Sequence, residues 1–474
     1  MIHKTKIIAT VGPACNSYEQ LLALVNAGVN VFRLNFSHGT HESHAEVIRN
    51  IQEINKEFPL NIAILADLQG PKLRVGSIAG GALELAEGQT ITFCSTPNQE
   101  GTADCLYISY PNFHHDVQVG EKILMDDGKI DARITEITAD HKVKATVLTA
   151  GVLLPNKGVN LPDTKISLPS LTEKDLRDLD FIIGQQIDWV ALSFVRKPQD
   201  IEHLRQQLTA KGSRAKIIAK IEKPEALNHL REIVLTSDAI MIARGDLGVE
   251  MPVEKIPMFQ KDIIRKCIHR AKPVIVATQM MESMIDRSHP NRSEVTDVAN
   301  AVTEGTDAVM LSGETAMGKH PALVVQTMVN IIKEVEKEKT VYNRNLTPQP
   351  HSPSFLSDAL CYNACRIAED VHADALIGMT QSGYTGFMLS SYRPHAALFV
   401  FSQTESLINQ LSLSWGVQAF HYHLTDDLDQ MIFGQIEFLK EKGLLKSGDI
   451  VVNTGSMPVS EHLPTNMLKI TKAE

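Results

Sequence analysis

The sequence predicts an α/β protein built as a (β/α)8 barrel, with an inserted all-β lid domain and a C-terminal α/β domain. Three observations favour this architecture. Eight short apolar runs recur along the first two thirds of the chain, most of them followed by a segment of helical periodicity. After the third run, the helical segments give way to alternating, turn-rich sequence. A proline-rich stretch near residue 345 then precedes a further set of alternating elements.

The eight apolar runs predict the strands of the barrel. They occupy 6–12, 29–37, 61–70, 188–195, 215–222, 239–248, 273–280 and 308–315, and helix-like segments include 17–27, 41–57, 198–211, 224–235, 255–271 and 291–303. Strands that alternate with helices indicate a parallel sheet, and eight such units indicate a closed TIM barrel. A doubly wound open sheet is the alternative. It is less favoured because nearly every run ends in polar residues, whereas an open sheet concentrates its site at one switch point.

The stretch 71–167 predicts an inserted β-barrel domain. Its segments EGQTITF, KILMDDGKIDARI and KVKATVLTAG alternate polar and apolar residues, and Asp127-Gly128 is a hairpin signal. An insertion at a loop on the catalytic side of a barrel is well placed to act as a lid. A scaffold without such a role is the alternative.

Residues 345–474 predict a third, regulatory domain of α/β type. The stretch NLTPQPHSPS at 345–354 reads as a linker because it holds three prolines. The barrel is therefore expected to comprise 1–70 and 168–344.

Composition restricts the class of function. The 474 residues include 46 basic and 56 acidic side chains, and the net charge of −10 argues against a broad surface for nucleic acid or an anionic membrane. No apolar run is long enough to span a membrane, and the N-terminal segment lacks the apolar core of a signal peptide. Six scattered cysteines without a CxxC pair suit a reducing compartment. We expect a cytoplasmic protein.

Polar residues cluster at the ends of the predicted strands, where a barrel of this kind carries its reactive groups. They are Thr10, Arg33, Asn35, Ser37, Asp67, Ser193, Lys220, Glu222, Arg244, Asp246, Thr278, Ser312 and Glu314. Cations and carboxylates gathered at one mouth suit a divalent cation together with an anionic substrate.

Lys220 and Glu222 stand two residues apart on one strand, so their side chains point the same way. A mutually satisfied buried ion pair is the plain interpretation. Asp246 on the adjacent strand favours a functional one, because two hard oxygen ligands with room for water suit Mg²⁺. Asp246 could instead cap the following turn.

Three other motifs suggest anion binding. Arg33 in RLNFSHG can make bidentate hydrogen bonds to a phosphate or carboxylate. Arg74, just past a Gly-Pro turn, would bind a nucleotide phosphate or serve as a surface hinge residue. TQSGYTG at 380–386 would hold a phosphate on backbone amides or form an ordinary turn.

Taken together, these residues resemble the pyruvate kinase family. The motifs that carry the resemblance, in the family's order, are RLNFSHGTHESH, NKGVNLP, AKIEKPEAL, ARGDLGVE, ATQMMESM, RSEVTDVANAV and LSGETAMG. The resemblance implies transfer of a phosphoryl group from phosphoenolpyruvate to ADP, giving pyruvate and ATP in the final step of glycolysis.

The resemblance also implies residue roles. Glu222 and Asp246 would hold Mg²⁺, with Mn²⁺ as a substitute ion. Lys220 and Arg33 would contact the phosphoryl group, Thr278 would lie near the carbon that is protonated, and the amides of Gly245 and Asp246 would receive the substrate carboxylate. The residues that would face the nucleotide are Asn35, Ser37, His38, Arg74 and Lys157, the last brought in by the lid.

A homotetramer with effector regulation through the C-terminal domain is likewise implied. Thr380, Ser382 and Thr385 retain part of the family's phosphate-holding loop. The later loop TGSMPVSEHLPTN lacks the basic and aromatic residues of sugar-bisphosphate-regulated members. We therefore expect a phosphate-bearing effector or none, and at best a weak response to fructose 1,6-bisphosphate.

The chain departs from the commonest family pattern at Leu68, Gln69 and Lys72, where many members have threonine, lysine and glutamate and require K⁺. In those members K⁺ sits among groups matching Asn35, Ser37 and Asp67. Lys72 would bring a fixed ammonium to this neighbourhood, so K⁺ is expected not to be required. If Lys72 instead points to solvent, K⁺ would still bind.

Two competing functions share some of these features. A Mg²⁺-dependent pyruvate-type aldolase would use the Glu/Asp metal pair but would need neither the lid nor Arg74 and Lys157. A metabolite-sensing protein could keep the fold without catalysis, although the intact set of Lys220, Glu222, Asp246 and Thr278 argues against it. Pyruvate formation from phosphoenolpyruvate, assayed with and without ADP, separates the three.

Overall fold

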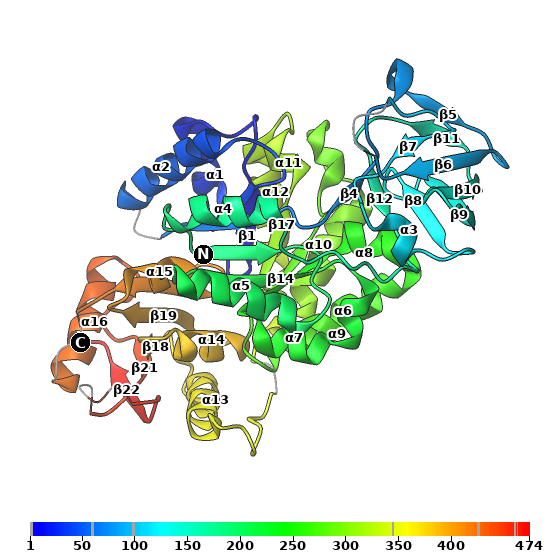
Figure 1. Ribbon diagram of the computed structural model, residues 1–474. Helices are drawn as coiled ribbons and strands as arrows, with labels where there is room; N and C mark the ends of the chain where they lie inside the picture. The colour runs from blue at the N-terminus through cyan, green and yellow to red at the C-terminus, as the bar shows by residue number, and fades with distance from the viewer. Residues whose placement is uncertain are drawn as a thin grey trace.

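A closed barrel of eight parallel strands forms the centre of the computed structural model (Figure 1), which describes residues 3–57, 61–96, 100–343, 346–423, 427–458, 461 and 463–474. The strands are β1 (Lys6–Thr10), β2 (Val31–Asn35), β3 (Ala63–Asp67), β13 (Trp189–Leu192), β14 (Lys216–Ile221), β15 (Ala239–Ala243), β16 (Val274–Ala277) and β17 (Ala308–Leu311). Each pairs with its neighbours in parallel, and β1 closes the ring against β17. The predicted TIM barrel is confirmed, and the open sheet is wrong.

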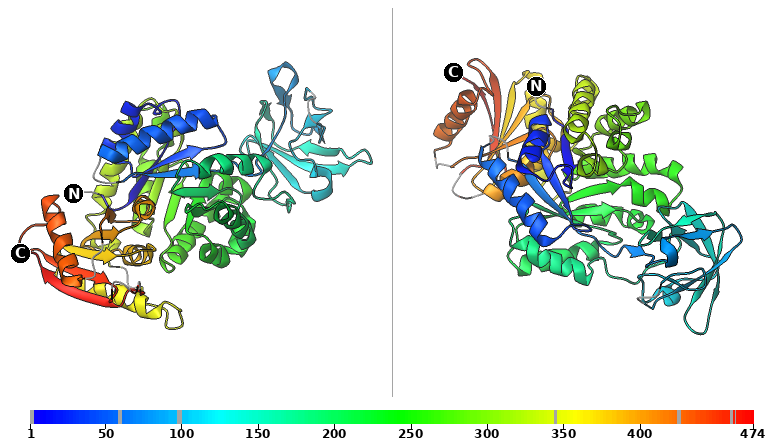
Figure 2. Two further views of the ribbon diagram at one scale, coloured as in Figure 1. Left: turned by 60° about the vertical axis from the view of Figure 1, so that its left-hand side comes forward. Right: turned by 90° about the horizontal axis from the view of Figure 1, so that it is seen from above.

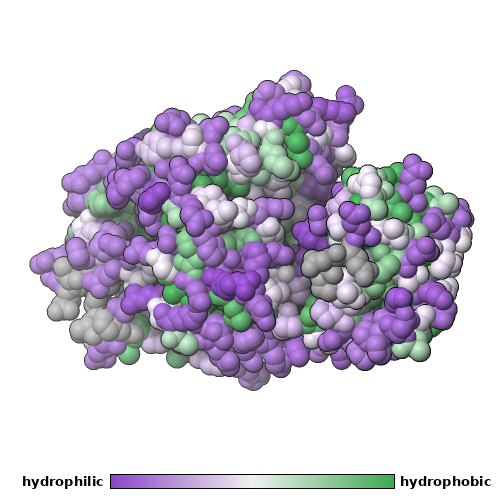
Figure 3. Space-filling view, turned by 45° about the horizontal axis from the view of Figure 1, so that its top comes forward, coloured by the Kyte–Doolittle hydropathy of each residue, from purple (hydrophilic) through white to green (hydrophobic). Residues whose placement is uncertain are grey.

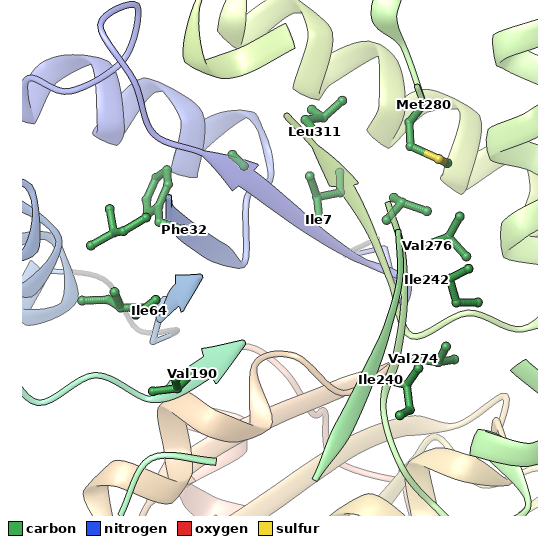
Figure 4. Close-up of a cluster of buried hydrophobic side chains, with 14 of the residues drawn as sticks. Ile7, Phe32, Ile64, Val190, Ile240, Ile242, Val274, Val276, Met280 and Leu311 are labelled. Carbon is green, nitrogen blue, oxygen red and sulfur yellow. The ribbon is translucent and has the colours of Figure 1, made fainter. Parts of the chain in front are cut away.

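The barrel strands are buried on both faces, which explains why they read as continuous apolar runs. Successive side chains alternate: Ile7 and Ile240 pack in the layer between strands and helices, whereas Ile8 and Met241 fill the barrel interior. Figure 4 shows Ile7, Ile240 and their outward-facing counterparts on the other strands.

Helices alternate with the barrel strands and surround them. They are α1 (Tyr18–Ala27), α2 (His41–Glu57), α4 (Glu173–Ile183), α5 (Pro198–Ala210), α6 (Pro224–Asn228), α7 (Leu230–Thr236), α8 (Arg244–Glu250), α9 (Ile256–Ile268), α10 (Arg292–Glu304), α11 (Gly313–Ala316) and α12 (Pro321–Val335). Local signals set their ends. Ser17 caps α1 in a capping box with Gln20, and Gly28 ends the helix at φ 125°.

Two predicted segments differ from the structure. The helix expected over 224–235 is two helices, because the backbone leaves helical geometry at His229 (φ −114°, ψ 17°), and its N–H bonds to Ala226 O in a turn. The strand expected over 239–248 ends at Ala243, because Arg244 begins α8. Asp246 therefore lies in the first turn of a helix rather than on a strand.

The insertion between β3 and β13 is a separate β domain that stands away from the barrel (Figure 2). Its elements are β4 (Leu73–Arg74), β5 (Leu83–Leu85), β6 (Thr90–Cys94), β7 (Leu106–Tyr107), α3 (Phe113–Asp116), β8 (Lys122–Met125), β9 (Ile130–Ile137), β10 (Val143–Val147), β11 (Gly151–Leu153) and β12 (Gly158–Asn160). It has its own core, in which Phe93 packs edge-on against Phe113.

The C-terminal part forms a five-stranded sheet in the order β20-β19-β18-β21-β22, in which only β22 runs antiparallel. Its elements are α13 (Phe355–Asp370), β18 (Ala375–Met379), α14 (Tyr384–Ser391), β19 (Ala397–Ser402), α15 (Glu405–Leu411), β20 (Val417–His421), α16 (Leu428–Glu441), β21 (Ile450–Gly455) and β22 (Met467–Lys472). The predicted boundary at 344/345 lies outside the described residues.

The C-terminal sheet domain is joined to the floor of the barrel, opposite its mouth. Leu413 is buried with the side chains of the barrel interior, and Trp189 Nε1 donates to Gln410 O at 3.2 Å. Arg393, which is 1% exposed, pairs with Asp307 at 3.0 Å just before β17. The buried side chain of Leu413 and the buried ion pair between Arg393 and Asp307 thus attach this domain to the barrel.

The face in Figure 3 is mainly hydrophilic, with small scattered hydrophobic groups. Among the described residues, no helix is both long and apolar enough to cross a membrane.

Candidate active site

A buried carboxylate holds two cations together at the mouth of the barrel. Asp67, at the end of β3, accepts from Arg33 Nε at 2.7 Å and lies 3.2 Å from Lys220 Nζ. Arg33 also donates to Thr10 Oγ1 at 3.1 Å. Because these residues come from β1, β2, β3 and β14, the closed barrel brings together groups that lie far apart in the sequence.

Opposite charges at this point stabilise one another. Burial would raise the pKa of Asp67, but Lys220 and Arg33 outweigh it and lower that pKa. Burial would likewise lower the pKa of Lys220, but Asp67 and Glu222 outweigh it and raise the pKa above its ordinary value. Lys220 therefore carries a permanent positive charge, directed by Ser193 Oγ at 2.8 Å and Glu222 Oε1 at 2.8 Å.

Glu222 and Asp246 lie close enough for the charge of Asp246 to act on Glu222. Burial raises the pKa of Glu222, and the nearby Asp246 raises it further while Lys220 opposes both. A second oxygen of Glu222 accepts from Phe194 N at 2.7 Å. Two carboxylates that repel each other fit a divalent cation, which would relieve that repulsion and which prefers oxygen ligands. The interpretation of Asp246 as a helix cap is not supported, since Ala243 stands at the cap position of α8.

Lys72 points inward. Its Nζ lies 3.4 Å from Asp246 Oδ1, and the side chain is 31% exposed. The alternative in which Lys72 points to solvent is therefore wrong.

Thr278 is held in an unusual backbone conformation, φ 69°, beyond the end of β16. A β-branched residue in the left-handed region costs about 1–3 kcal/mol, so surrounding contacts must fix it. Arg244 Nη2 donates to Thr278 O at 2.7 Å, and Thr278 Oγ1 accepts from Gly245 N at 2.7 Å.

The predicted nucleotide side is brought together only in part. His38 lies near Arg74, Arg33 and Lys72: burial first, and then these cations, lower its pKa. Asn35 Oδ1 accepts from Ser37 N at 3.1 Å beside them. Lys157 is held within the inserted domain, where its Nζ lies 2.8 Å from Asp126 Oδ1.

Three residues orient the site although the sequence predicts no role for them. Ser193 and Arg244 are predicted only as polar residues at strand ends, because their partners, Lys220 and Thr278, come from other strands. Thr10 likewise supports Arg33 across the barrel. Their only sequence signal was a polar side chain at the end of an apolar run.

A buried polar junction joins the inserted domain to the barrel. Glu250 Oε1 accepts from Asn160 Nδ2 at 2.7 Å and from Lys223 Nζ at 2.5 Å. Asn160 belongs to β12, whereas the other two residues belong to barrel loops and helices. No local pattern in the sequence indicates this junction.

The predicted effector loop borders a cavity of about 710 Å³ in the C-terminal sheet domain. Thr380, Ser382 and Thr385 line it, together with apolar residues such as Leu356, Met379 and Met431. No lysine or arginine occurs among the described lining residues. In the later loop, 459–460 and 462 lie outside the described residues.

The fold and the site define a TIM-barrel enzyme that acts on an anionic substrate with the help of a divalent cation. A family model of the pyruvate kinase barrel domain matches residues 2–325, and one of the pyruvate kinase α/β domain matches 358–471. The chain therefore belongs to the pyruvate kinase family, whose members are glycolytic and depend on a divalent metal.

Comparison with individual proteins supports the same family assignment. The pyruvate kinases of Staphylococcus aureus strains USA300 and NCTC 8325 are each 40% identical to this chain over 471 residues, which covers 99% of this chain and 80% of theirs. A crystal structure of a pyruvate kinase from Cryptosporidium parvum matches with a TM-score of 0.92 and 36% identity, covering 100% of this chain and 96% of that one. The activity is that of a pyruvate kinase, which excludes the aldolase and the non-catalytic sensor.

Proposed function

We propose that the chain transfers the phosphoryl group of phosphoenolpyruvate to ADP at the mouth of the barrel, giving pyruvate and ATP. The observation that carries this assignment is the pair of cations, Lys220 and Arg33, held on the single buried carboxylate of Asp67. Phosphoryl transfer needs alignment and positive charge around developing anionic oxygens, and little covalent chemistry from the protein. Two fixed cations supply that charge without rearrangement.

Glu222 and Asp246 would hold Mg²⁺, or Mn²⁺ in its place. When bound, the metal neutralises charge on the substrate oxygens and helps to align them. Within the chain, Phe194 N fixes the orientation of the Glu222 carboxylate at 2.7 Å. Lys220 Nζ lies 2.8 Å from Glu222 Oε1 and Lys72 Nζ lies 3.4 Å from Asp246 Oδ1, so each prospective ligand has a cation beside it.

Thr278 and the first turn of α8 would bind the rest of phosphoenolpyruvate. The amides of Gly245 and Asp246 would receive the substrate carboxylate, and Gly245 N would exchange its present bond to Thr278 Oγ1 at 2.7 Å for that carboxylate. Thr278 would lie near the carbon that accepts a proton when the enolate collapses. Arg244 supports this arrangement, because it holds the carbonyl of Thr278 and is itself bound to Asp297 at 2.7 Å.

ADP would enter on the side of Asn35, Ser37, His38 and Arg74. Lys157 would join them if the inserted domain moves toward the barrel mouth and its ammonium releases Asp126, a residue of the same domain. We therefore assign the inserted domain, predicted over 71–167, the role of a lid that excludes water from the transfer. The barrel would comprise 1–70 and 168–344, and the regulatory domain 345–474.

We further propose that turnover does not require K⁺. The ammonium of Lys72, half-buried against Asp246, brings a fixed positive charge close to His38, which also feels the charge of Arg33. A monovalent cation near Asn35, Ser37 and Asp67 would be redundant there and partly repelled.

We also propose a homotetramer regulated through the C-terminal domain, with Thr380, Ser382 and Thr385 at the effector cavity. The absence of lysine and arginine among its described lining residues supports a weak response to fructose 1,6-bisphosphate. A phosphate there would depend on hydroxyls and backbone amides alone.

One coupled assay tests the reaction. Pyruvate should form from phosphoenolpyruvate only when both ADP and Mg²⁺ or Mn²⁺ are present. Equal pyruvate formation without ADP would contradict phosphoryl transfer to the nucleotide.

A further inference from the structure

A strongly basic pocket lies outside the active site, at the side of the barrel. It has a volume of about 260 Å³ and lies between α7, α9 and Gln349 of the segment that leads into the C-terminal domain. Its basic lining residues are Arg231, Arg265, Lys266, His269 and Arg270. The chain as a whole has a net charge of −10, so this local concentration of positive charge is opposite in sign to the net charge.

Only part of this charge is neutralised by the protein. Asp262 pairs with Arg265 at 2.7 Å and also with Lys266. The guanidinium groups of Arg231 and Arg270 make no ion pair or hydrogen bond within the part of the chain that the structure describes. Like charges held around one cavity repel each other, and a bound anion would relieve that repulsion.

Helix electrostatics account for some of the basic residues but not for all. Arg265, Lys266, His269 and Arg270 lie in the last turn of α9 or just after it, where the helix dipole favours cations. Arg231 lies in the first turn of α7, where the same dipole disfavours a cation. Glu232 in that turn is not among the lining residues. An anion in the pocket explains the position of Arg231, which the helices do not.

The size and charge of the pocket limit the ligand. Its volume falls just below the range of about 300–1,000 Å³ typical of drug-sized ligands, so a nucleoside triphosphate is too large. Guanidinium groups match the oxygens of phosphate in a bidentate manner, and two unpaired arginines suit a doubly charged group. We propose that this pocket binds a small phosphomonoester, such as a sugar monophosphate, through Arg231 and Arg270.

This site is distinct from the effector cavity beside Thr380, which has no arginine or lysine among its described lining residues. A ligand here would touch two barrel helices and Gln349 at once. An adjoining small cavity, which also includes His269, Arg270 and Gln349, extends to Ser391 and Tyr392 at the end of α14. A phosphomonoester would therefore strengthen the contact between the barrel and the C-terminal domain.

Calorimetric titration of the full-length protein tests the proposal. The probes are glucose 6-phosphate and inorganic phosphate, with glucose and succinate as uncharged and carboxylate controls. The test variant is Arg231→Gln/Arg270→Gln. The matched control is Arg49→Gln/Arg177→Gln, which removes the same charge from exposed positions on α2 and α4. The active site is intact in every protein, so phosphate bound there contributes equally.

We expect the wild-type and control proteins to bind one more equivalent of glucose 6-phosphate per chain than the test variant. At this site the test variant should lose affinity by about tenfold or more, because two charge-assisted contacts are gone. Equal binding by the test and control variants would overturn the proposal, as would equal losses in both. Succinate binding as tight as that of glucose 6-phosphate would overturn the phosphate assignment. If the double variant melts early, Arg231→Gln alone replaces it.

Discussion

Lys220 is the residue whose charge the site fixes most firmly, because Asp67 and Glu222 both hold it ionised. We expect Lys220→Met to lower kcat by roughly 10³-fold or more while the fold remains intact, since a cation at the transferring group acts mainly in the transition state. Steady-state kinetics and circular dichroism check this. Lys220→Arg, which keeps the charge, should retain more activity. Near-normal turnover in folded Lys220→Met would contradict the assigned role.

Lys72 decides the proposed independence from K⁺. With Lys72→Glu, the fixed ammonium beside Asp246 is replaced by a carboxylate, and the locality becomes attractive to a monovalent cation. We expect wild-type turnover to be nearly unchanged by about 100 mM KCl in tetramethylammonium buffer at constant ionic strength, and the variant to become K⁺-dependent. Large, saturable K⁺ activation of the wild type would show the proposal to be wrong.

The residues of the mouth could be anticipated from the sequence because a strand end is a local pattern. The alternation of side chains around Lys220 and Glu222 is evident from a few neighbouring residues. The polar residues at the end of RLNFS are evident in the same way. The residues that contact them could not be predicted, because the register between strands determines which side chains meet. Ser193 meets Lys220, and Arg244 supports Thr278, only once the barrel closes.

At the scale of elements, the junction between β12 and the barrel governs how the inserted domain is attached. Glu250→Gln would leave Lys223, which is 9% exposed, buried without a charged partner. Loss of one partner of a buried ion pair lowers stability by about 3–5 kcal/mol. We therefore expect faster amide hydrogen exchange around residues 158–168. The double variant Lys223→Met/Glu250→Leu removes both charges and should restore much of the protection. Unchanged exchange in Glu250→Gln would mean that the ion pair does not hold the domain.

The elements themselves were predictable where periodicity was strong. The eight strands and most barrel helices follow directly from short apolar runs and 3.6-residue patterns. The break at His229 and the early end of β15 at Ala243 were missed, because in both places the sequence continues the local pattern. The backbone bonds that interrupt it, such as that from His229 N to Ala226 O, leave no compositional mark.

At the scale of the whole molecule, a buried carboxyl on the barrel floor should make stability depend on pH. Burial raises the pKa of Asp188 from 3.8 to about 7, although Ile64 N donates to it at 2.8 Å. The folded state therefore binds a proton that the unfolded state has released, and stability falls as pH rises from about 4 to about 7.

Replacing that carboxyl should remove the dependence. Asp188→Asn should raise the melting temperature at pH 8 but hardly at pH 4, with a gain of up to about 4 kcal/mol. Thermal melts at both values, with exposed Asp127→Asn as the control, check this. An equal effect of Asp188→Asn at both pH values would contradict the linkage.

The contact between Arg393 and Asp307 should couple the unfolding of the barrel and the C-terminal sheet domain. Arg393→Met leaves Asp307 buried and lacking its cation, which costs about 3–5 kcal/mol. We expect calorimetry to show the C-terminal sheet domain unfolding at a lower temperature than the barrel. Arg366→Met, which removes an exposed pair with Glu369, should change stability by less than about 1 kcal/mol. A single unshifted transition in Arg393→Met would refute the coupling.

The closure of the barrel has a consequence for how the protein is made. β1 cannot pair with β17 until residue 311 has been synthesised, and Lys6 Nζ donates to Val417 O at 2.7 Å. β1 must therefore wait until all the barrel strands from β2 to β17 have been synthesised before its second edge is covered. Its apolar residues Ile7 and Ile8 lack that cover until then, so the nascent chain is most prone to misassociation before β17 has been synthesised.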